Sequence, residues 1–86
     1  MVTYNIEWKA SAVKELRKLP KVAVEKIIKA VAMLSTESRP VGVKKLTASQ
    51  NTYRIRVGSY RVVYNIFDTK FVIEIIKVRD RKEAYK

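Results

Sequence analysis

The 86-residue chain contains no cysteine, no histidine and only eight acidic residues. Without cysteine it can form neither disulfides nor thiolate metal sites. Without histidine it lacks the commonest acid–base catalyst near pH 7, and a transition-metal site would depend on carboxylates alone. We expect no metal and no small-molecule cofactor, and any catalysis must use another kind of side chain.

Long apolar runs are also missing. No stretch has the length and apolarity of a membrane span, and Met1–Lys9 lacks the hydrophobic run of a signal peptide. We therefore expect a cytoplasmic protein with no membrane partner. Apolar residues still make up 48% of the chain, which is enough for a core, and the length suits a single domain covering residues 1–86.

Positive charge is in large excess. Nineteen lysines and arginines against eight acidic residues leave a net charge of +11. A field of this size attracts polyanions, and nucleic acid is the first candidate. The alternative is a solvated basic surface with no specific partner.

Periodicity predicts one strand followed by two helices. Apolar and polar residues alternate from Val2 to Trp8, as in a half-buried strand. A first helix follows, with Ser11 as a possible N-cap, and Pro20 separates it from a second helix that ends near Ser35. Apolar positions at helical spacing in the second helix are Val24, Ile27, Ile28, Val31 and Leu34.

The second half of the chain predicts a long loop and three strands. Residues 35–51 contain proline, glycine and small polar residues and favour a loop. The strand-like segments that follow are Thr52–Val57, Tyr60–Phe67 and Phe71–Val78. Gly58-Ser59 indicates a two-residue type II′ turn, and Asp68-Thr69 a second turn.

These elements predict an α+β fold in the order β-α-α-β-β-β. The sheet would be mostly antiparallel and four-stranded, with the αα-hairpin packed on one face. A short basic tail, Arg79–Lys86, would follow the last strand. Five aromatic residues on apolar positions are expected in the core rather than at a binding surface: Tyr4, Trp8, Tyr53, Tyr60 and Tyr64.

The predicted hairpin places two arginines opposite each other. A two-residue turn aligns Arg56 with Arg61, and strand alternation puts Arg54 on the same face. Like charges in this position destabilise the pair, so the pattern favours a bound anion, above all phosphate, held by the planar guanidinium groups. The alternative is that Glu74 of the next strand, opposite Val63, neutralises the arginines.

The tail adds basic groups at the same end of the sheet. If the last two strands pair, Lys77 and Val78 come level with Tyr60 and Arg61, so the tail leaves close to the paired arginines. The tail carries Arg79, Arg81, Lys82 and Tyr85.

Four segments of the chain resemble the RelE toxins of bacterial and archaeal toxin–antitoxin pairs. They are YRIRVGSYRVVYNIFD at 53–68, RDRKEAYK at 79–86, IEWKASAVKELRKLP at 6–20 and KKL at 44–46. The resemblance implies a metal-free endoribonuclease that cuts messenger RNA at the ribosome and leaves a 2′,3′-cyclic phosphate. It also implies a RelB-like antitoxin as partner. An acidic, amphipathic peptide of this antitoxin would suit the basic groove.

Two other functions stay open. The same superfamily includes ParE toxins, which inhibit DNA gyrase and do not cut RNA, and likeness of fold does not decide function. A non-catalytic RNA-binding module would also use a basic surface.

The resemblance implies roles for single residues. RelE enzymes use basic residues in two strands and an arginine and a tyrosine in the tail, which match Arg54, Arg56, Arg61, Arg81 and Tyr85. Tyr85 would be the general base, because surrounding arginines favour its phenolate form. Arg54 and Arg61 would hold the phosphate, Arg81 would face the leaving 5′-oxygen, and Arg56 would orient the RNA.

Other positions are assigned less specific roles, and some depart from the family pattern. Lysines are frequent where Arg54 and Arg56 stand, and Asp80 replaces a histidine of some relatives, so the general acid stays open. Lys44 and Lys45 are expected to contact ribosomal RNA phosphates. Arg79 and Lys82 are expected to add general electrostatic attraction to RNA.

Overall fold

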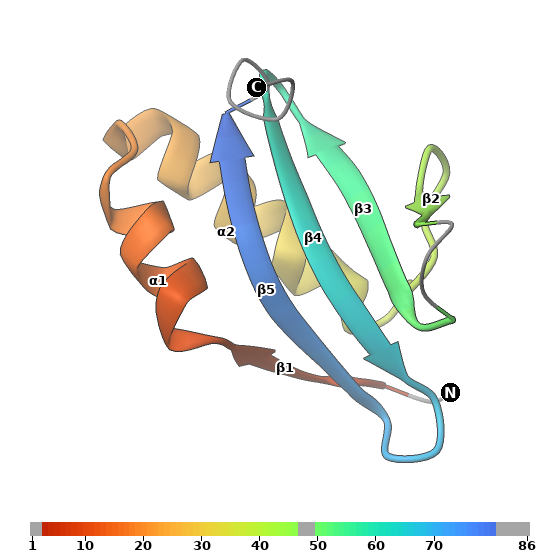
Figure 1. Cartoon of the computed structure of the whole chain (residues 1–86). Coiled ribbons are helices and arrows are strands. Elements are labelled where there is room, and N and C mark those ends of the chain that lie inside the picture. Colours follow the sequence, from red (N-terminus) through yellow and green to blue (C-terminus); the bar gives the residue numbers. More distant parts are fainter. Residues whose placement is uncertain (1–2, 47–49, 81–86) are drawn as a thin grey trace.

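Two helices cover one face of a five-stranded sheet (Figure 1). The computed structural model describes residues 3–46 and 50–80. The helices are α1 (Ala10–Arg17) and α2 (Lys21–Leu34), and the strands are β1 (Asn5–Trp8), β2 (Lys44–Lys45), β3 (Thr52–Val57), β4 (Tyr60–Phe67) and β5 (Val72–Asp80). The strand order is β1-β5-β4-β3-β2, with β1 parallel to β5 and the other neighbours antiparallel. The predicted α+β class is confirmed.

The number of strands differs from the prediction of four. The additional strand is β2, which lies in the segment predicted as a loop and pairs antiparallel with Tyr53 and Arg54 of β3. Two residues are too few to show the alternation that marks a strand, so the sequence pattern gives no sign of it. Its position beside β3 brings Lys44 and Lys45 to the edge of the sheet.

Both helices form where periodicity predicts them, with one wrong cap. Lys9 is the N-cap of α1 and makes no side-chain cap hydrogen bond, so the predicted cap Ser11 lies inside the helix. The chain enters α1 directly from β1, and the helix therefore starts two residues earlier than the predicted cap implies. Pro20 precedes α2 and Ser35 ends it, as predicted.

The buried face of α2 is rotated slightly from the predicted one. Buried residues recur mainly at intervals of four: Ala23, Ile27, Val31 and Leu34. Ile28 was predicted on this face, but its side chain is 48% exposed. It lies at the margin of the stripe, one position past Ile27, where the sheet no longer covers the helix.

The turn between β4 and β5 is longer than the predicted two residues. Phe67 pairs with Val72, so residues 68–71 form the turn and β5 begins one residue later than predicted. Phe71 has a φ of 53°, in the left-handed region, and its ring packs edge-on against Tyr4 at a centroid distance of 5.8 Å. A β-bulge follows in β5 opposite Val63 and Tyr64.

These two irregularities change the predicted register. Glu74 pairs with Asn65 rather than with Val63, and β5 continues to Asp80. Arg79, which the sequence places in the tail, therefore belongs to β5. An extra residue in one strand shifts every later side chain by one position, which simple alternation cannot anticipate.

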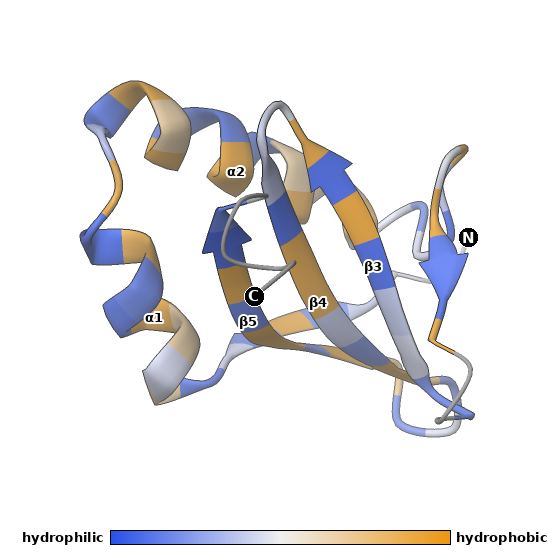
Figure 2. Ribbon diagram, turned by 45° about the horizontal axis from the view of Figure 1, so that its top comes forward, coloured by the Kyte–Doolittle hydropathy of each residue, from blue (hydrophilic) through white to orange (hydrophobic). Residues whose placement is uncertain are grey.

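The core lies between the helices and the sheet. Figure 2 shows polar and apolar residues alternating along β3, and the largest fully buried side chains include Tyr64, Ile27, Leu34, Ile66 and Ile73. The other aromatics predicted in the core, Tyr4, Trp8, Tyr53 and Tyr60, are partly buried and pack against it. Neither helix in residues 3–46 and 50–80 has the length and apolarity to cross a membrane.

Tyr64 should make stability depend on pH. Burial raises its pKa to about 12 from 10.0, and its hydroxyl donates to the Ser38 carbonyl at 3.0 Å. As pH rises, the unfolded phenol ionises first, so the stabilising effect is complete below about pH 10 and is lost toward about pH 12. Tyr64→Phe should lower the free energy of unfolding by about 1 kcal/mol at neutral pH. Urea titrations at increasing pH should show this difference shrinking between about pH 10 and about pH 12. A difference in unfolding free energy that stays constant over this pH range would show that the buried Tyr64 hydroxyl does not cause the pH dependence.

Candidate nucleic-acid interface

The sheet face opposite the helices carries a first row of three arginines. Arg56 of β3 faces Arg61 of β4, which in turn faces Arg79 of β5. The predicted Arg56–Arg61 pair is thus confirmed. Gly58 has a φ of 61° and Ser59 has no positive φ, which fits the predicted type II′ turn.

A second row lies beside the first and contains three more cations. Lys44, Arg54, Val63 and Lys77 are aligned across β2, β3, β4 and β5. The rows are two residues apart along each strand, which corresponds to about 7 Å. Lys77 was missed as a site residue because the bulge places it on this face. The one signal in the sequence is that Lys77 is a charged residue between the apolar residues Ile76 and Val78, which favours a side chain that points to solvent.

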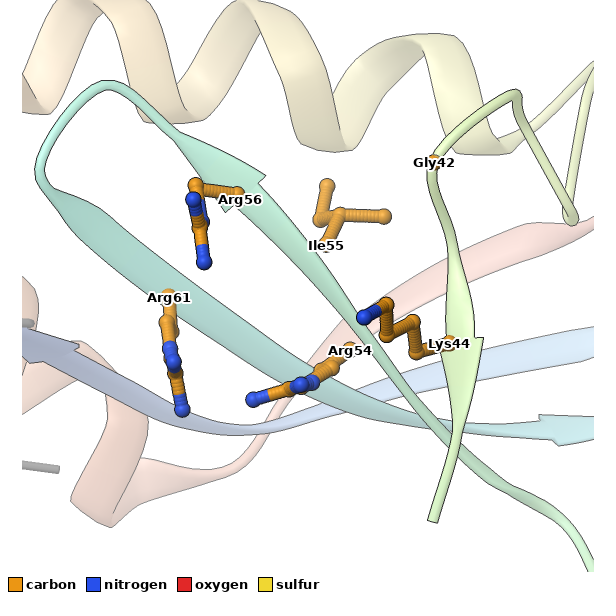
Figure 3. A pocket seen from close by; sticks show the side chains of 6 residues that line it. All are labelled: Gly42, Lys44, Arg54, Ile55, Arg56 and Arg61. Atoms are coloured by element: carbon orange, nitrogen blue, oxygen red, sulfur yellow. The ribbon is translucent and has the colours of Figure 1, made fainter. Parts of the chain in front are cut away.

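A pocket of about 310 Å³ opens on this face and is lined by Gly42, Lys44, Arg54, Ile55, Arg56 and Arg61. Figure 3 shows the three arginine side chains on the same side of the β3–β4 hairpin, with Lys44 reaching toward them from β2. Within the described part of the chain, Arg54 and Arg56 form no ion pair with an acidic residue. The pocket therefore presents several cations to a bound anion.

Glu74 does not neutralise these arginines, contrary to the alternative considered from the sequence. It lies opposite Asn65, whose Nδ2 donates to Glu74 Oε1 at 3.3 Å. Among residues 3–46 and 50–80 it makes no ion pair. The four-residue turn places Glu74 opposite Asn65 instead of Val63, and therefore outside the row that holds Arg54.

Some predicted residues lie outside the pocket. Lys45 pairs with Tyr53, so its side chain leaves β2 toward the opposite face from Lys44. Arg79 continues the arginine row, but its Nε donates to Glu15 Oε2 at 2.9 Å. The predicted catalytic residues Arg81 and Tyr85, and the predicted RNA-binding residue Lys82, lie outside the described residues.

Arg39 anchors the loop that leads to β2 to the turn between β4 and β5. Its guanidinium donates to both carboxylate oxygens of Asp68, at 2.9 and 3.4 Å, and its Nε donates to the Tyr53 hydroxyl at 3.3 Å. Tyr4 adds a hydrogen bond to Asp68 Oδ1 at 2.7 Å. The bonds from Arg39 and Tyr4 lower the pKa of the Asp68 carboxyl. This network holds the loop that brings β2 to the pocket.

The arrangement can hold phosphate oxygens by charge and by the donors of three guanidinium groups. In the described part of the chain, no three acidic residues are grouped to hold a metal ion. The chemistry that this face supports best is therefore stabilisation of negative charge on a phosphate by arginine and lysine.

Known proteins resemble this chain in sequence and fold. A family model described as the ParE toxin of the type II toxin–antitoxin system parDE matches residues 6–85. The mRNA interferase toxin RelE of Escherichia coli is 33% identical over 88 residues, which cover 98% of this chain and 92% of the relative.

Solved structures resemble the fold along nearly the whole chain. A chain of the archaeal RelE–RelB complex from Pyrococcus horikoshii superposes with a TM-score of 0.83 at 32% identity, covering 93% of this chain and 97% of that one. A chain of the intact E. coli RelBE toxin–antitoxin complex superposes with a TM-score of 0.79 at 30% identity, covering 90% and 95%. The protein therefore belongs to the RelE/ParE superfamily of type II toxins, as a RelE-type member.

Proposed function

We propose that this toxin is a ribosome-dependent endoribonuclease that cleaves messenger RNA without a metal. The observation that carries the proposal is the pocket in which Arg54, Arg56, Arg61 and Lys44 converge from three strands. Arginines held side by side in this way suit the non-bridging oxygens of a phosphodiester, where negative charge builds up during cleavage. The name of the E. coli relative, an mRNA interferase, supports the same activity.

In the proposed reaction, the ribose 2′-oxygen attacks the adjacent phosphorus and the bond to the 5′-oxygen breaks. Tyr85 takes the proton from the 2′-hydroxyl, and the products are a 2′,3′-cyclic phosphate and a 5′-hydroxyl end. Arg54 and Arg61 stabilise the charge on the phosphate, and Arg56 orients the strand. Arg81 faces the leaving 5′-oxygen and offsets its charge until that oxygen takes a proton from water and becomes the 5′-hydroxyl. The tail that carries Arg81 and Tyr85 follows Asp80, which pairs with Tyr60 beside the arginine row.

Two partners follow from the proposal. The ribosome would present the messenger, and the remaining basic groups, Lys44, Lys45, Arg79 and Lys82, would contribute attraction to RNA phosphates. A RelB-like antitoxin would bind and inhibit the toxin. The solved complexes that contain related toxins together with RelB support this partner, and a net charge of +11 suits an acidic peptide.

Gyrase inhibition is the second candidate, because the matching family model describes a ParE toxin. Translation in vitro, with messenger 5′ ends mapped by primer extension, separates the two functions. Cuts in phase with codons are expected from the ribonuclease. If the messenger stays intact while cleaved supercoiled DNA accumulates with gyrase, the second candidate is correct. If neither occurs, the protein is a non-catalytic binder.

Lys77 should contribute one phosphate contact to RNA binding. It is exposed in the row that contains Arg54 and Lys44. The slope of log affinity against log salt changes by about 0.7 for each single-strand phosphate contact, so Lys77→Gln should flatten the slope by about this amount. Lys29→Gln is the matched control, since Lys29 is exposed on α2. Equal slopes for the two variants in filter-binding titrations would place the RNA elsewhere.

A further inference from the structure

The last part of β5 extends beyond its neighbour β1. The two strands pair from Asn5–Val72 to Trp8–Ile75, and the Lys9 N–H adds a last hydrogen bond to the Ile75 carbonyl at 2.9 Å. The chain then turns into α1, so among residues 3–46 and 50–80 no strand pairs with residues 76–80 on that side. The end of β5 needs another partner on that edge, since unpaired backbone groups are costly where they are shielded from water.

Glu15 of α1 supplies that partner. Its Oε1 accepts a hydrogen bond from the Val78 N–H at 3.2 Å, and its Oε2 accepts one from Arg79 Nε at 2.9 Å. Its side chain is 21% exposed, against 47% for Arg79, so the pair is partly shielded from water. Leu16, the next residue of α1, is buried in the core, so the helix that presents Glu15 is fixed. One carboxylate thus joins two consecutive residues of β5 to a fixed helix.

This contact lies where the proposed site is completed. Arg79 is directly opposite Arg61, and the tail with Arg81 and Tyr85 follows immediately after β5. A negative charge beside a surface that binds RNA weakens the attraction to phosphate. For binding alone, the chain would gain from a neutral residue at position 15. A group that aligns the reacting residues would instead raise the rate of the chemical step.

We propose that Glu15 is a positioning residue for cleavage, one that fixes the end of β5 and holds the Arg79 side chain in the arginine row. This role of Glu15 rests on the proposed ribonuclease function and adds one residue to the proposed site. Glu15 acts through the Val78 backbone and the Arg79 guanidinium and does not touch the RNA. Its loss should therefore lower the rate of cleavage without weakening binding.

The test uses the full chain with two substitutions at this position. Glu15→Gln keeps an acceptor for the Val78 N–H but removes the charge that holds Arg79, and Glu15→Leu, a good helix former, removes both contacts. Single-turnover cleavage of ribosome-bound messenger at saturating toxin should fall on the order of tenfold in Glu15→Gln and up to a hundredfold in Glu15→Leu. The affinity for the ribosome should stay equal or rise. Glu25→Gln is the control, because Glu25 is exposed on α2 and the change in net charge is the same.

A second measurement does not depend on cleavage. Hydrogen exchange of the Val78 amide, followed by NMR, should be near wild type in Glu15→Gln and about five- to tenfold faster in Glu15→Leu, as expected for one lost hydrogen bond. The Nε–H resonance of Arg79 should shift in both variants. Faster exchange together with unchanged cleavage would show a purely structural contact and overturn the proposal, as would unchanged exchange in Glu15→Leu. A wild-type protein that does not cut messenger would overturn the proposed function, while the exchange data would still test the contact.

Discussion

Replacing Arg61 by alanine is expected to lower messenger cleavage by about 10²- to 10³-fold, the loss typical when a group that stabilises transition-state charge is removed. Arg61 is half-buried in the centre of the arginine row, with Arg56 on one side and Arg79 on the other. The stability of the domain should be unchanged or slightly higher, because like charges directly opposite each other in a sheet are unfavourable. Thermal melts and single-turnover cleavage on ribosome-bound messenger measure the two effects separately.

Arg17→Ala provides the control for this experiment. Arg17 is exposed in the last turn of α1 and does not line the pocket, and its removal changes the net charge equally. Normal cleavage by Arg17→Ala beside strong loss in Arg61→Ala would assign the effect to the pocket. If Arg61→Ala cuts at the wild-type rate, or if it unfolds, the arginine row is not a site for phosphate.

Tyr85→Phe is expected to lower cleavage by about 10²- to 10⁴-fold, the range for loss of a positioned general base. The substitution removes one oxygen and keeps the ring, so packing should survive. Affinity for the ribosome should change little, because the charges that produce it remain. Filter binding and single-turnover cleavage, measured on the same preparation, show whether Tyr85→Phe lowers the cleavage rate while leaving the affinity unchanged.

Tyr60→Phe controls for the loss of a tyrosine hydroxyl in general. Tyr60 packs against the core and pairs with Asp80, so its ring lies near the start of the tail. A gyrase inhibitor or a passive RNA binder would show no separation between binding and cutting in Tyr85→Phe. Wild-type cleavage by Tyr85→Phe would mean that another group takes the proton, even with the family assignment intact.

Local patterns predicted the hairpin that forms the site. The bounds of β3 and β4 agree with the sequence prediction, because Gly58 adopts the positive φ that a two-residue turn requires. That turn determines the register, so the Arg56–Arg61 pair could be derived from residue counting alone. The helices were also predictable, since their apolar spacing extends over several turns.

The parts that were missed depend on contacts between distant segments. The strand β2 forms where the loop passes beside β3, and the ion pair of Arg39 with Asp68, 29 residues away in sequence, anchors that loop. The four-residue turn and the one-residue bulge in β5 are local irregularities without a sequence period. The bulge places Lys77 opposite Val63 on the basic face, and the longer turn places Glu74 opposite Asn65, outside the two rows of cations on that face.

Glu15 illustrates the same limit for the candidate site. It belongs to an ordinary amphipathic helix, and its spacing from Val78 and Arg79 along the chain exceeds 60 residues. Its role becomes visible only when β1 is seen to end before β5 does. The resemblance to RelE toxins indicated which basic residues and which tyrosine to examine, whereas the structure shows that Glu15 contacts Val78 and Arg79 at the end of β5.

We propose that this toxin cuts messenger RNA held on a ribosome by attack of the 2′-oxygen. The most direct test incubates the purified wild-type protein with messenger alone and with ribosome–messenger complexes, and determines the chemistry of the new 3′ ends. We expect cleavage only in the ribosome complex, with 3′ ends that resist ligation until the 2′,3′-cyclic phosphate is removed. Intact messenger in the complex, or free 3′-hydroxyl ends, would contradict it.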